Sequence, residues 1–238
     1  MEPLYKNVHK DLLNKINNGF YKQGETIPTE LELAELYQVS RPTIRQAVQL
    51  LVNDGYLEKR KKRGTIVCTP KIQQEFTQVI ESFDDEMKRK GLIPKTKVIS
   101  FRIEKANEEV CSALQLEENE EVYKLTRLRF TQNQPNVLVL TYIPCHYFPN
   151  LLDIDFTSNR LYNIFHKEGL PIESIKRKLD TIAADDTVAD LLDINPKDPI
   201  FYFHSIGYTK NRVPIEYSIS KYRGDINSFV FELSTKAI

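Results

Sequence analysis

The chain has few of the features that mark metal proteins or secreted proteins. Its 238 residues include three cysteines, Cys68, Cys111 and Cys145, which lie far apart and form no C-x-x-C pair. This usage is typical of a protein kept reduced in the cytosol. The four histidines are scattered, with no spacing that would gather them on a metal ion. We therefore expect no metal site and no cofactor.

Long apolar runs and nucleotide-binding or catalytic motifs are also missing. No stretch approaches the roughly 20 apolar residues that cross a bilayer, and the first residues lack the apolar segment of a signal peptide. There is no glycine-rich phosphate loop and no nucleophile elbow. The pair Cys145-His146 could on paper supply a nucleophile and a base. Neighbours in an extended segment point opposite ways, so we favour an ordinary structural role and predict a cytoplasmic protein that is not an enzyme.

The net charge is zero as well, but the charged residues are unevenly distributed along the chain. The chain holds 33 Lys and Arg against 33 Asp and Glu. Residues 1–70 carry 11 basic against 8 acidic residues, whereas the remainder carries 22 against 25. Five consecutive cations occupy residues 59–63. Such a local cluster can contact nucleic-acid phosphates even in a neutral protein.

The clearest pattern is a two-faced helix over residues 40–53. Arg41, Arg45 and Gln49 lie four apart on one face, and Ser40 can cap the N-terminus. Taken alone, such a helix is more often an ordinary surface helix than a nucleic-acid reader. Apolar residues at helical spacing predict a buried stripe on the other face, formed by Ile44, Ala47, Val48, Leu51 and Val52.

Two further elements favour the nucleic-acid reading. Thr29 and Glu32 form a capping box that begins a helix just upstream, separated by a short turn. After Gly55 the sequence predicts a strand, a basic turn over residues 59–63 and a returning strand. With a first helix over residues 3–18, this is a winged helix-turn-helix, whose wing cations would meet DNA phosphates. Its predicted core contains Val8, Leu12, Ile16, Leu33, Leu36, Val39, Ile44, Val48 and Leu51.

The rest of the chain predicts a separate α+β domain. Residues 68–74 hold a proline and no clear periodicity, so we expect a DNA-binding domain over 1–69, a linker over 70–75 and a second domain over 76–238. Hairpin-linked strands with a few helices indicate a mostly antiparallel sheet. The predicted helices cover residues 76–90, 107–114, 161–167 and 185–192. The predicted strands cover residues 96–103, 121–130, 137–143, 174–183, 200–208, 213–222 and 229–233.

Two of these strands carry candidate ligand-binding residues. Alternation places Arg127 and Arg129 on one face, where guanidinium groups could bind a carboxylate or phosphate. Glu216 and Tyr222 share a face with two serines, which would suit a ligand with hydroxyl groups. An exposed charged face for the first strand, and an edge strand facing water for the second, explain the same spacing.

The motifs resemble those of a known family. GETIPTELELAELYQVSRPTIRQAVQLLVNDGYLEKRKKRGTIV is similar to the N-terminal domain of GntR-type bacterial transcription regulators. From about residue 75 onward, YKLTRLRFTQNQP and VPIEYSISKYRGD resemble the UTRA ligand-binding domain of the HutC subfamily. The first match rests on Pro28, Glu30, Ser40, Arg41, Thr43, Arg45, Ala47, Gly64, Thr65 and Val67.

The resemblance implies a chorismate-lyase-like second domain, a homodimer, and a small metabolite that controls binding to double-stranded operator DNA. The implied DNA-binding residues are Thr29, Glu30, Ser40, Arg41, Thr43, Arg45, Gln46, Lys61, Lys62, Arg63 and Gly64. The implied effector-binding residues are Ser82, Phe83, Arg127, Arg129, Glu216 and Tyr222.

Three features of the sequence bear on the effector. Val139 stands where sensors of amino-sugar phosphates typically carry glutamate, which argues against an amino sugar. Arg160 replaces a common serine and would either add a cation to the site or point into water. Asp84 and Asp85 follow Ser82-Phe83, an awkward neighbourhood for an anion. We expect a phosphorylated, non-amino sugar, such as a disaccharide phosphate.

These patterns favour a metabolite-responsive repressor that leaves a palindromic operator when its effector binds. The alternative from another class is a lyase-like enzyme fused to a DNA-binding head. Residues 71–238 supply no convincing acid–base or nucleophilic set for it. A scaffold without a ligand is a third possibility, which the same-face arginines and the set around Glu216 disfavour.

Overall fold

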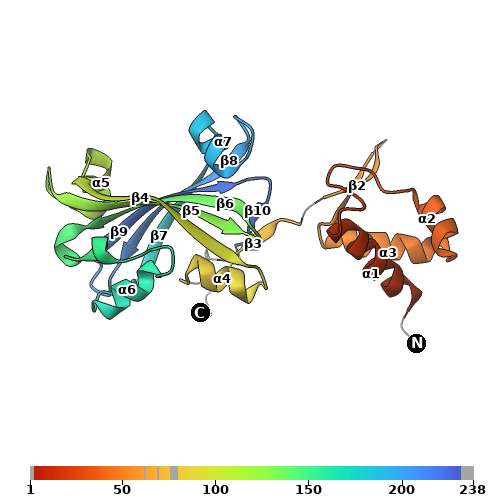
Figure 1. Cartoon of the computed structure of the whole chain (residues 1–238), viewed down its shortest axis with the longest axis horizontal. Coiled ribbons are helices and arrows are strands. Elements are labelled where there is room, and N and C mark those ends of the chain that lie inside the picture. The colour runs from red at the N-terminus through yellow and green to blue at the C-terminus, as the bar shows by residue number, and fades with distance from the viewer. Residues whose placement is uncertain (1–2, 62, 69, 76–79, 232–238) are drawn as a thin grey trace, which may run out of the picture. The chain divides into compact units, whose positions relative to one another are not determined.

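The computed structural model describes residues 3–61, 63–68, 70–75 and 80–231. The chain divides into two compact units, residues 1–72 and residues 73–238 (Figure 1). Each unit has hydrophobic clusters of its own. Within the described residues, no helix is long and apolar enough to cross a membrane.

The first unit is three helices followed by a two-stranded hairpin. Thr29 and Glu32 form the predicted capping box, and the Ser40 side chain accepts a hydrogen bond from the backbone N–H of Thr43. These caps begin the second and third helices where the sequence places them. The elements are α1 (Leu4–Asn17), α2 (Glu30–Tyr37), α3 (Arg41–Asn53), β1 (Leu57–Arg60) and β2 (Gly64–Val67).

One predicted core residue of this unit is wrong. Leu36 is 61% exposed, although Leu12, Leu33, Ile44 and Leu51 are fully buried as predicted. Because α2 has only eight residues, it buries one narrow stripe through Leu33 and Ala34, and Leu36 lies to the side of it.

The second unit is built on one six-stranded antiparallel sheet, which confirms the α+β prediction. The strand that carries Glu216 and Tyr222, β9 (Pro214–Arg223), lies inside this sheet, so the alternative that it is an edge strand facing water is wrong. In spatial order the strands are β4 (Pro94–Lys105), β5 (Glu121–Thr131), β6 (Gln134–Pro144), β9 (Pro214–Arg223), β8 (Pro199–Tyr208) and β7 (Ser174–Ala183).

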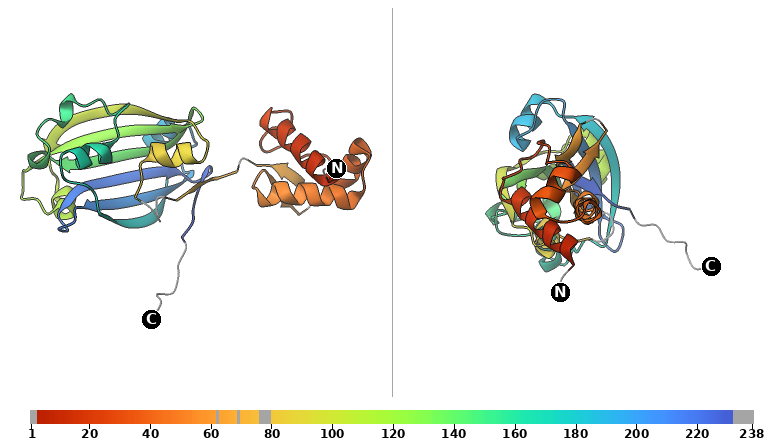
Figure 2. Two further views of the ribbon diagram at one scale, coloured as in Figure 1. Left: turned by 90° about the horizontal axis from the view of Figure 1, so that it is seen from below. Right: turned by 90° about the vertical axis from the view of Figure 1, so that its right-hand side faces the viewer.

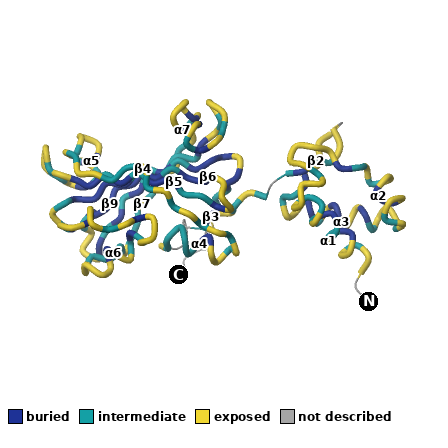
Figure 3. Tube along the Cα trace, in the orientation of Figure 1, coloured by how far each residue is buried: buried dark blue, intermediate teal, exposed yellow. Residues whose placement is uncertain are grey.

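Short helices lie on both faces of this sheet. In Figures 1 and 2, α4 and α6 lie on one face, and α5 and α7 on the other. The central strands are the most deeply buried part of the unit (Figure 3). The helices are α4 (Phe83–Arg89), α5 (Glu108–Leu114), α6 (Leu161–Lys167) and α7 (Asp186–Leu192), with short 3₁₀ turns at Cys145–Tyr147 and Leu151–Asp153.

Three predicted segments differ from the structure by more than a few residues at a strand end. The helix expected over residues 76–90 begins only at Phe83, because Ser82 caps it and residues 80–82 are not helical; residues 76–79 lie outside the described part. The expected linker contains a strand, β3 (Ile72–Gln74), which pairs with β10 (Asn227–Phe229). The buried amide of Gln74 donates to Asn227, a long-range pairing that has no local sequence signal. The last strand was predicted over residues 229–233; the described strand β10 ends at residue 229, and residues 232 and 233 lie outside the described part.

Candidate functional sites

All six residues predicted to bind an effector line one cavity of the second unit. The cavity encloses about 790 Å³, including space open to solvent at its mouth, a size within the range of small-molecule sites. Its walls come from β5, β9 and the starts of α4 and α6. The six residues are Ser82, Phe83, Arg127, Arg129, Glu216 and Tyr222.

Arg127 is the buried cation of this cavity. Its side chain is 3% exposed, and one terminal nitrogen donates to Thr141 Oγ1 at 3.2 Å. Its Nε is buried without a hydrogen-bond partner in the described part of the chain. Burial lowers the pKa of Arg127, and neighbouring Arg129 lowers it further. A buried guanidinium with an unsatisfied donor attracts an anion, so the exposed-face alternative is wrong for Arg127.

Arg129 is held by an aromatic contact from α4. Its guanidinium lies over the Phe83 ring, 5.2 Å from the ring centroid, a cation–π arrangement. Ser82 is the N-cap of α4: its hydroxyl donates to the Asp85 carboxylate at 2.6 Å and accepts from the Asp85 N–H. Both predicted residues at the start of α4 thus shape the cavity wall.

Glu216 provides the acidic part of the cavity. It is 4% exposed, and the hydroxyl of Tyr162 on α6 donates to its carboxylate. Burial raises the pKa of Glu216, although this hydrogen bond and the nearby arginines oppose the rise. Ser218, Ser220 and Tyr222 follow on the same strand face and also line the cavity. Such a carboxylate–hydroxyl surface suits the hydroxyl groups of a ligand.

Arg177 and Tyr162 are among the cavity residues that the sequence did not predict. Arg177 lines the cavity from β7 and donates to Ser205 Oγ at 2.9 Å. It stands in the run Lys176-Arg177-Lys178, which reads as an ordinary exposed strand. Only the register of β7 on β8, which places Arg177 opposite Ser205, reveals its position. Tyr162 likewise gives no signal on its short helix.

The residues that depart from the family pattern also lie at the cavity. Val139 lines it and is nearly buried. Arg160 lines it as well, and its Nη1 lies 2.6 Å from Asp85 Oδ1. Of the two positions considered for Arg160, the cavity is therefore the one observed.

The first unit presents a polar face along α3. Arg41, Arg45 and Gln46 are exposed there, opposite the buried stripe. The side chain of Arg45 is 63% exposed, and its Nε donates to Glu30 at 3.1 Å. Glu30 also accepts from Lys59 of β1 at 3.0 Å. Burial raises the pKa of Glu30, but the bonds from Lys59 and Arg45 outweigh it, so the net shift is downward.

The other predicted DNA-binding residues are caps or hairpin residues. Thr29 and Ser40 cap α2 and α3, and the hydroxyl of Thr43 lies 2.9 Å from that of Ser40. At the hairpin turn Lys61, Arg63 and Gly64 are exposed, and Gly64 has φ +87°, a conformation that favours glycine. Lys62 lies outside the described residues.

Cys145 and His146 do not form a nucleophile–base pair. Both lie in one 3₁₀ turn, and His146 Nδ1 is 3.3 Å from Glu120. Burial raises the pKa of Cys145 to about 11, with Glu121 adding to the rise. This stabilises the thiol, whereas catalysis would need the thiolate.

Comparison with known proteins adds independent findings. A model of the gntR family of bacterial regulatory proteins matches residues 4–67, and a UTRA domain model matches residues 89–226. The HTH-type transcriptional repressor NagR of Bacillus subtilis is 32% identical over 228 residues, covering 96% of this chain and 93% of NagR. GmuR, an HTH-type transcriptional regulator of the same species, is 30% identical over 226 residues, covering 93% of this chain and 94% of GmuR. The crystal structure of PhnF from Mycobacterium smegmatis matches with a TM-score of 0.80 at 28% identity, covering 96% of this chain and all of that one.

Proposed function

Because this chain belongs to the GntR family of bacterial regulatory proteins, as a HutC-type member with a UTRA domain, we propose that it is a repressor released from a palindromic operator by a small anionic metabolite. It is a DNA-binding transcription regulator and not an enzyme. The repressor role is supported by its relative NagR, whose name describes a transcriptional repressor. Such a regulator would act in the cytoplasm, where operator DNA is found.

The proposed DNA contact is the exposed face of α3 together with the hairpin. Arg41, Arg45 and Gln46 would reach base edges or phosphates in the major groove. Lys61, Lys62 and Arg63 would contact the backbone beside it. Thr29 and Ser40 cap their helices, so we assign them to positioning the reading face. A homodimer would place two such faces on a palindromic operator, with residues 70–75 as the connecting segment between the units.

The effector is proposed to be a phosphorylated sugar without an amino group. Arg127 and Arg129 supply cations for a phosphate, and Glu216 with Tyr222 supplies partners for hydroxyl groups. Val139 supports a neutral sugar, because no carboxylate is present at that point of the cavity wall to pair with an ammonium group. The observation that carries this proposal is the buried, unsatisfied Nε of Arg127 beside the Glu216–Tyr162 pair.

A ligand screen on the full chain tests the proposal. Sugar phosphates, the matching free sugars, amino-sugar phosphates and carboxylates would each be added while the melting temperature and operator binding are measured. We expect a sugar phosphate to raise the melting temperature and to release the operator, with the free sugar inactive. Equal responses to a sugar with and without phosphate would contradict the anionic effector.

A further inference from the structure

The start of α4 places two carboxylates against the arginines of the cavity. Asp85 Oδ1 lies 2.6 Å from Arg160 Nη1, and this ion pair joins α4 to the start of α6. Asp84 lines the cavity with Arg129. Burial lowers the pKa of Arg129, and Asp84 is the neighbour that opposes this most. Arg160 is therefore paired with an acid of the protein itself, and the charge of Arg129 is partly offset by another.

We propose that Asp84 and Asp85 are an internal anion that competes with the effector for Arg129 and Arg160, and that α4 relays this competition to the segment leading to the DNA-binding unit. The inference rests on the proposed function, because it assumes that an anion enters this cavity. It also explains why acids follow Ser82-Phe83 in the sequence: they hold α4 in place until an anion replaces them.

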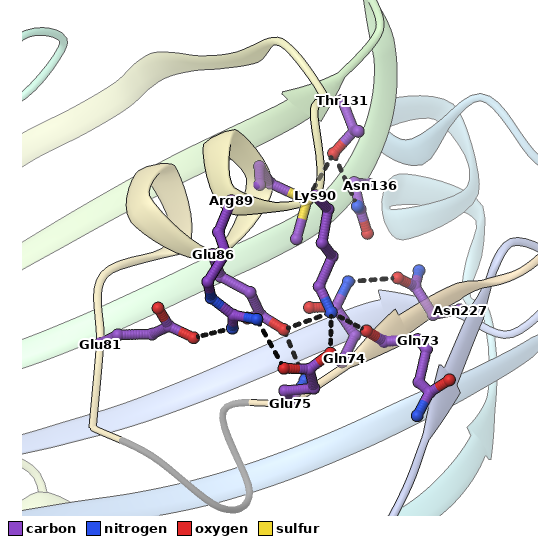
Figure 4. Close-up of polar contacts among 11 residues, drawn as sticks. Gln73, Gln74, Glu75, Glu81, Glu86, Arg89, Lys90, Thr131, Asn136 and Asn227 are labelled. Carbon is purple, nitrogen blue, oxygen red and sulfur yellow. Dashed lines mark hydrogen bonds and ion pairs between the residues drawn. The ribbon is translucent and has the colours of Figure 1, made fainter.

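The other end of α4 holds the connecting segment through Lys90 (Figure 4). The Lys90 ammonium donates to the backbone carbonyl of Gln73 and lies 3.0 Å from Glu75 and 3.3 Å from Glu86. Lys90 is the C-cap of α4, whereas Gln73 belongs to β3, directly after the first unit. One side chain thus ties the end of the helix to the backbone that carries the reading head.

Two more residues of α4 strengthen this attachment (Figure 4). Glu86 is 1% exposed and accepts the backbone N–H of Glu75 at 2.5 Å. Arg89 bridges Glu75 at 2.7 Å and Glu81 at 2.5 Å. Glu86 is the buried member of this network, so breaking its contacts would leave a buried carboxylate unsatisfied. A shift of α4 would therefore move residues 73–75 with it.

The packing of α4 permits such a shift. It has only seven residues, and among them Glu86 and Met87 are the two that are buried. Met87 is fully buried in the middle of the helix, and the hydroxyl of Thr131 donates to its sulfur at 3.5 Å. The start of the helix is held by the Asp85–Arg160 pair and by Phe83, which packs against the cluster around Val139 and Tyr222. Met87 holds its centre, and the ion pairs of Arg89 and Lys90 hold its end. Loss of the Asp85–Arg160 pair and of the Asp84 charge near Arg129 would allow α4 to tilt about Met87.

The test replaces the internal anion while keeping the helix cap. In Asp84→Asn/Asp85→Asn the amide oxygen at position 85 can still accept the Ser82 hydroxyl. Asp186→Asn is the matched control, because Asp186 is exposed in the first turn of α7 on the opposite sheet face. Lys90→Met removes the relay at the far end of α4. Each full-length variant would first be checked by circular dichroism.

The readouts are the affinity for inorganic phosphate and for glucose 6-phosphate, and the affinity for an operator fragment selected from random DNA. We expect the Asp84/Asp85 variant to bind phosphate about 2- to 5-fold more tightly than the control, the size expected for loss of one partly exposed ion pair and one nearby charge. It should also bind the operator more weakly without any added ligand. Lys90→Met should bind phosphate normally but no longer release the operator.

The outcomes separate this inference from the proposed function. If no phosphate compound binds any variant, yet the Asp84/Asp85 variant alone binds the operator more weakly, the effector class is wrong and the internal anion stands. If that variant and Asp186→Asn show the same phosphate and operator affinities, the internal anion is overturned. A Lys90→Met protein that still releases the operator normally overturns the relay.

Discussion

Replacing Arg127 with methionine should abolish the effector response without destabilising the protein. Methionine keeps a long apolar side chain and removes a cation that is 3% exposed and donates one hydrogen bond, of 3.2 Å, to Thr141. No carboxylate bonds it directly within the described residues. A buried guanidinium without a bonded carboxylate carries a desolvation cost that methionine does not have, so we expect the substitution to be neutral or slightly stabilising.

The two expected effects have opposite signs. A gain of about 1 kcal/mol would raise the melting temperature by ~2–4 °C for a chain of this size. Loss of a buried charged contact to a ligand costs about 2–5 kcal/mol, or roughly 30- to several thousand-fold in affinity. Arg127→Met should therefore melt at the same temperature or slightly higher and show no further stabilisation by the sugar phosphate.

Thermal melting with and without ligand, together with operator binding, measures both effects. Arg102→Met is the matched control, because Arg102 is an exposed arginine of β4 paired with Glu104 at 2.9 Å. The control should keep the effector response. An Arg127→Met protein that melts several degrees lower would show that the cation supports the fold, and one that still responds would remove Arg127 from the effector site.

Three further predictions concern the DNA-reading face and the acidic part of the cavity. Arg45→Ala should weaken specific operator binding by about 1–3 kcal/mol and relax sequence preference; equal losses on operator and random DNA would contradict base reading. Removing the charges of Lys61 and Lys62 should lower affinity for all DNA sequences and reduce the slope of the salt dependence by about one unit for each phosphate that the hairpin no longer neutralises. An unchanged salt dependence in binding isotherms would exclude the hairpin from the interface. Because the pKa of Glu216 is raised, its carboxyl group holds a proton more tightly in the folded state than in the unfolded state. The free energy of unfolding that this contributes is fully present below the ordinary carboxyl pKa. It is lost as the pH rises through the pKa of Glu216 in the folded state. Glu216→Gln should flatten that decline in melting temperature, and a variant with the wild-type pH profile would show that Glu216 is not its source.

The winged helix-turn-helix could be predicted from sequence because local signals determine it. The capping box at Thr29, the Ser40 cap and the helical spacing of Ile44 to Leu51 act over a few residues each. Leu36 is the one core residue that was predicted wrongly. Which side of the two-turn helix α2 is buried depends on what the helix packs against, and the sequence does not show this.

The strands of the second unit were also predictable from the sequence. So was the fact that the candidate residues of each strand lie on the same face of the sheet. Alternation places Arg127 with Arg129 and Glu216 with Tyr222 regardless of the fold. Alternation alone does not tell a buried face from an exposed one. That was decided by strand order, because β9 lies inside the sheet and both faces of an interior strand can be covered.

Only the tertiary structure brought the distant parts of the cavity together. Arg177 reaches it through the register of β7 on β8, and Glu216 meets Tyr162 from a helix more than fifty residues away in the chain. The contacts of Asp85 with Arg160, and of Lys90 with residues 73–75, likewise join separate elements. The sequence alone determined which residues could read DNA and which could bind an anion, because those properties belong to local pattern and side-chain chemistry. Burial, pairing and charge balance depend on long-range packing, and these were decided by the fold.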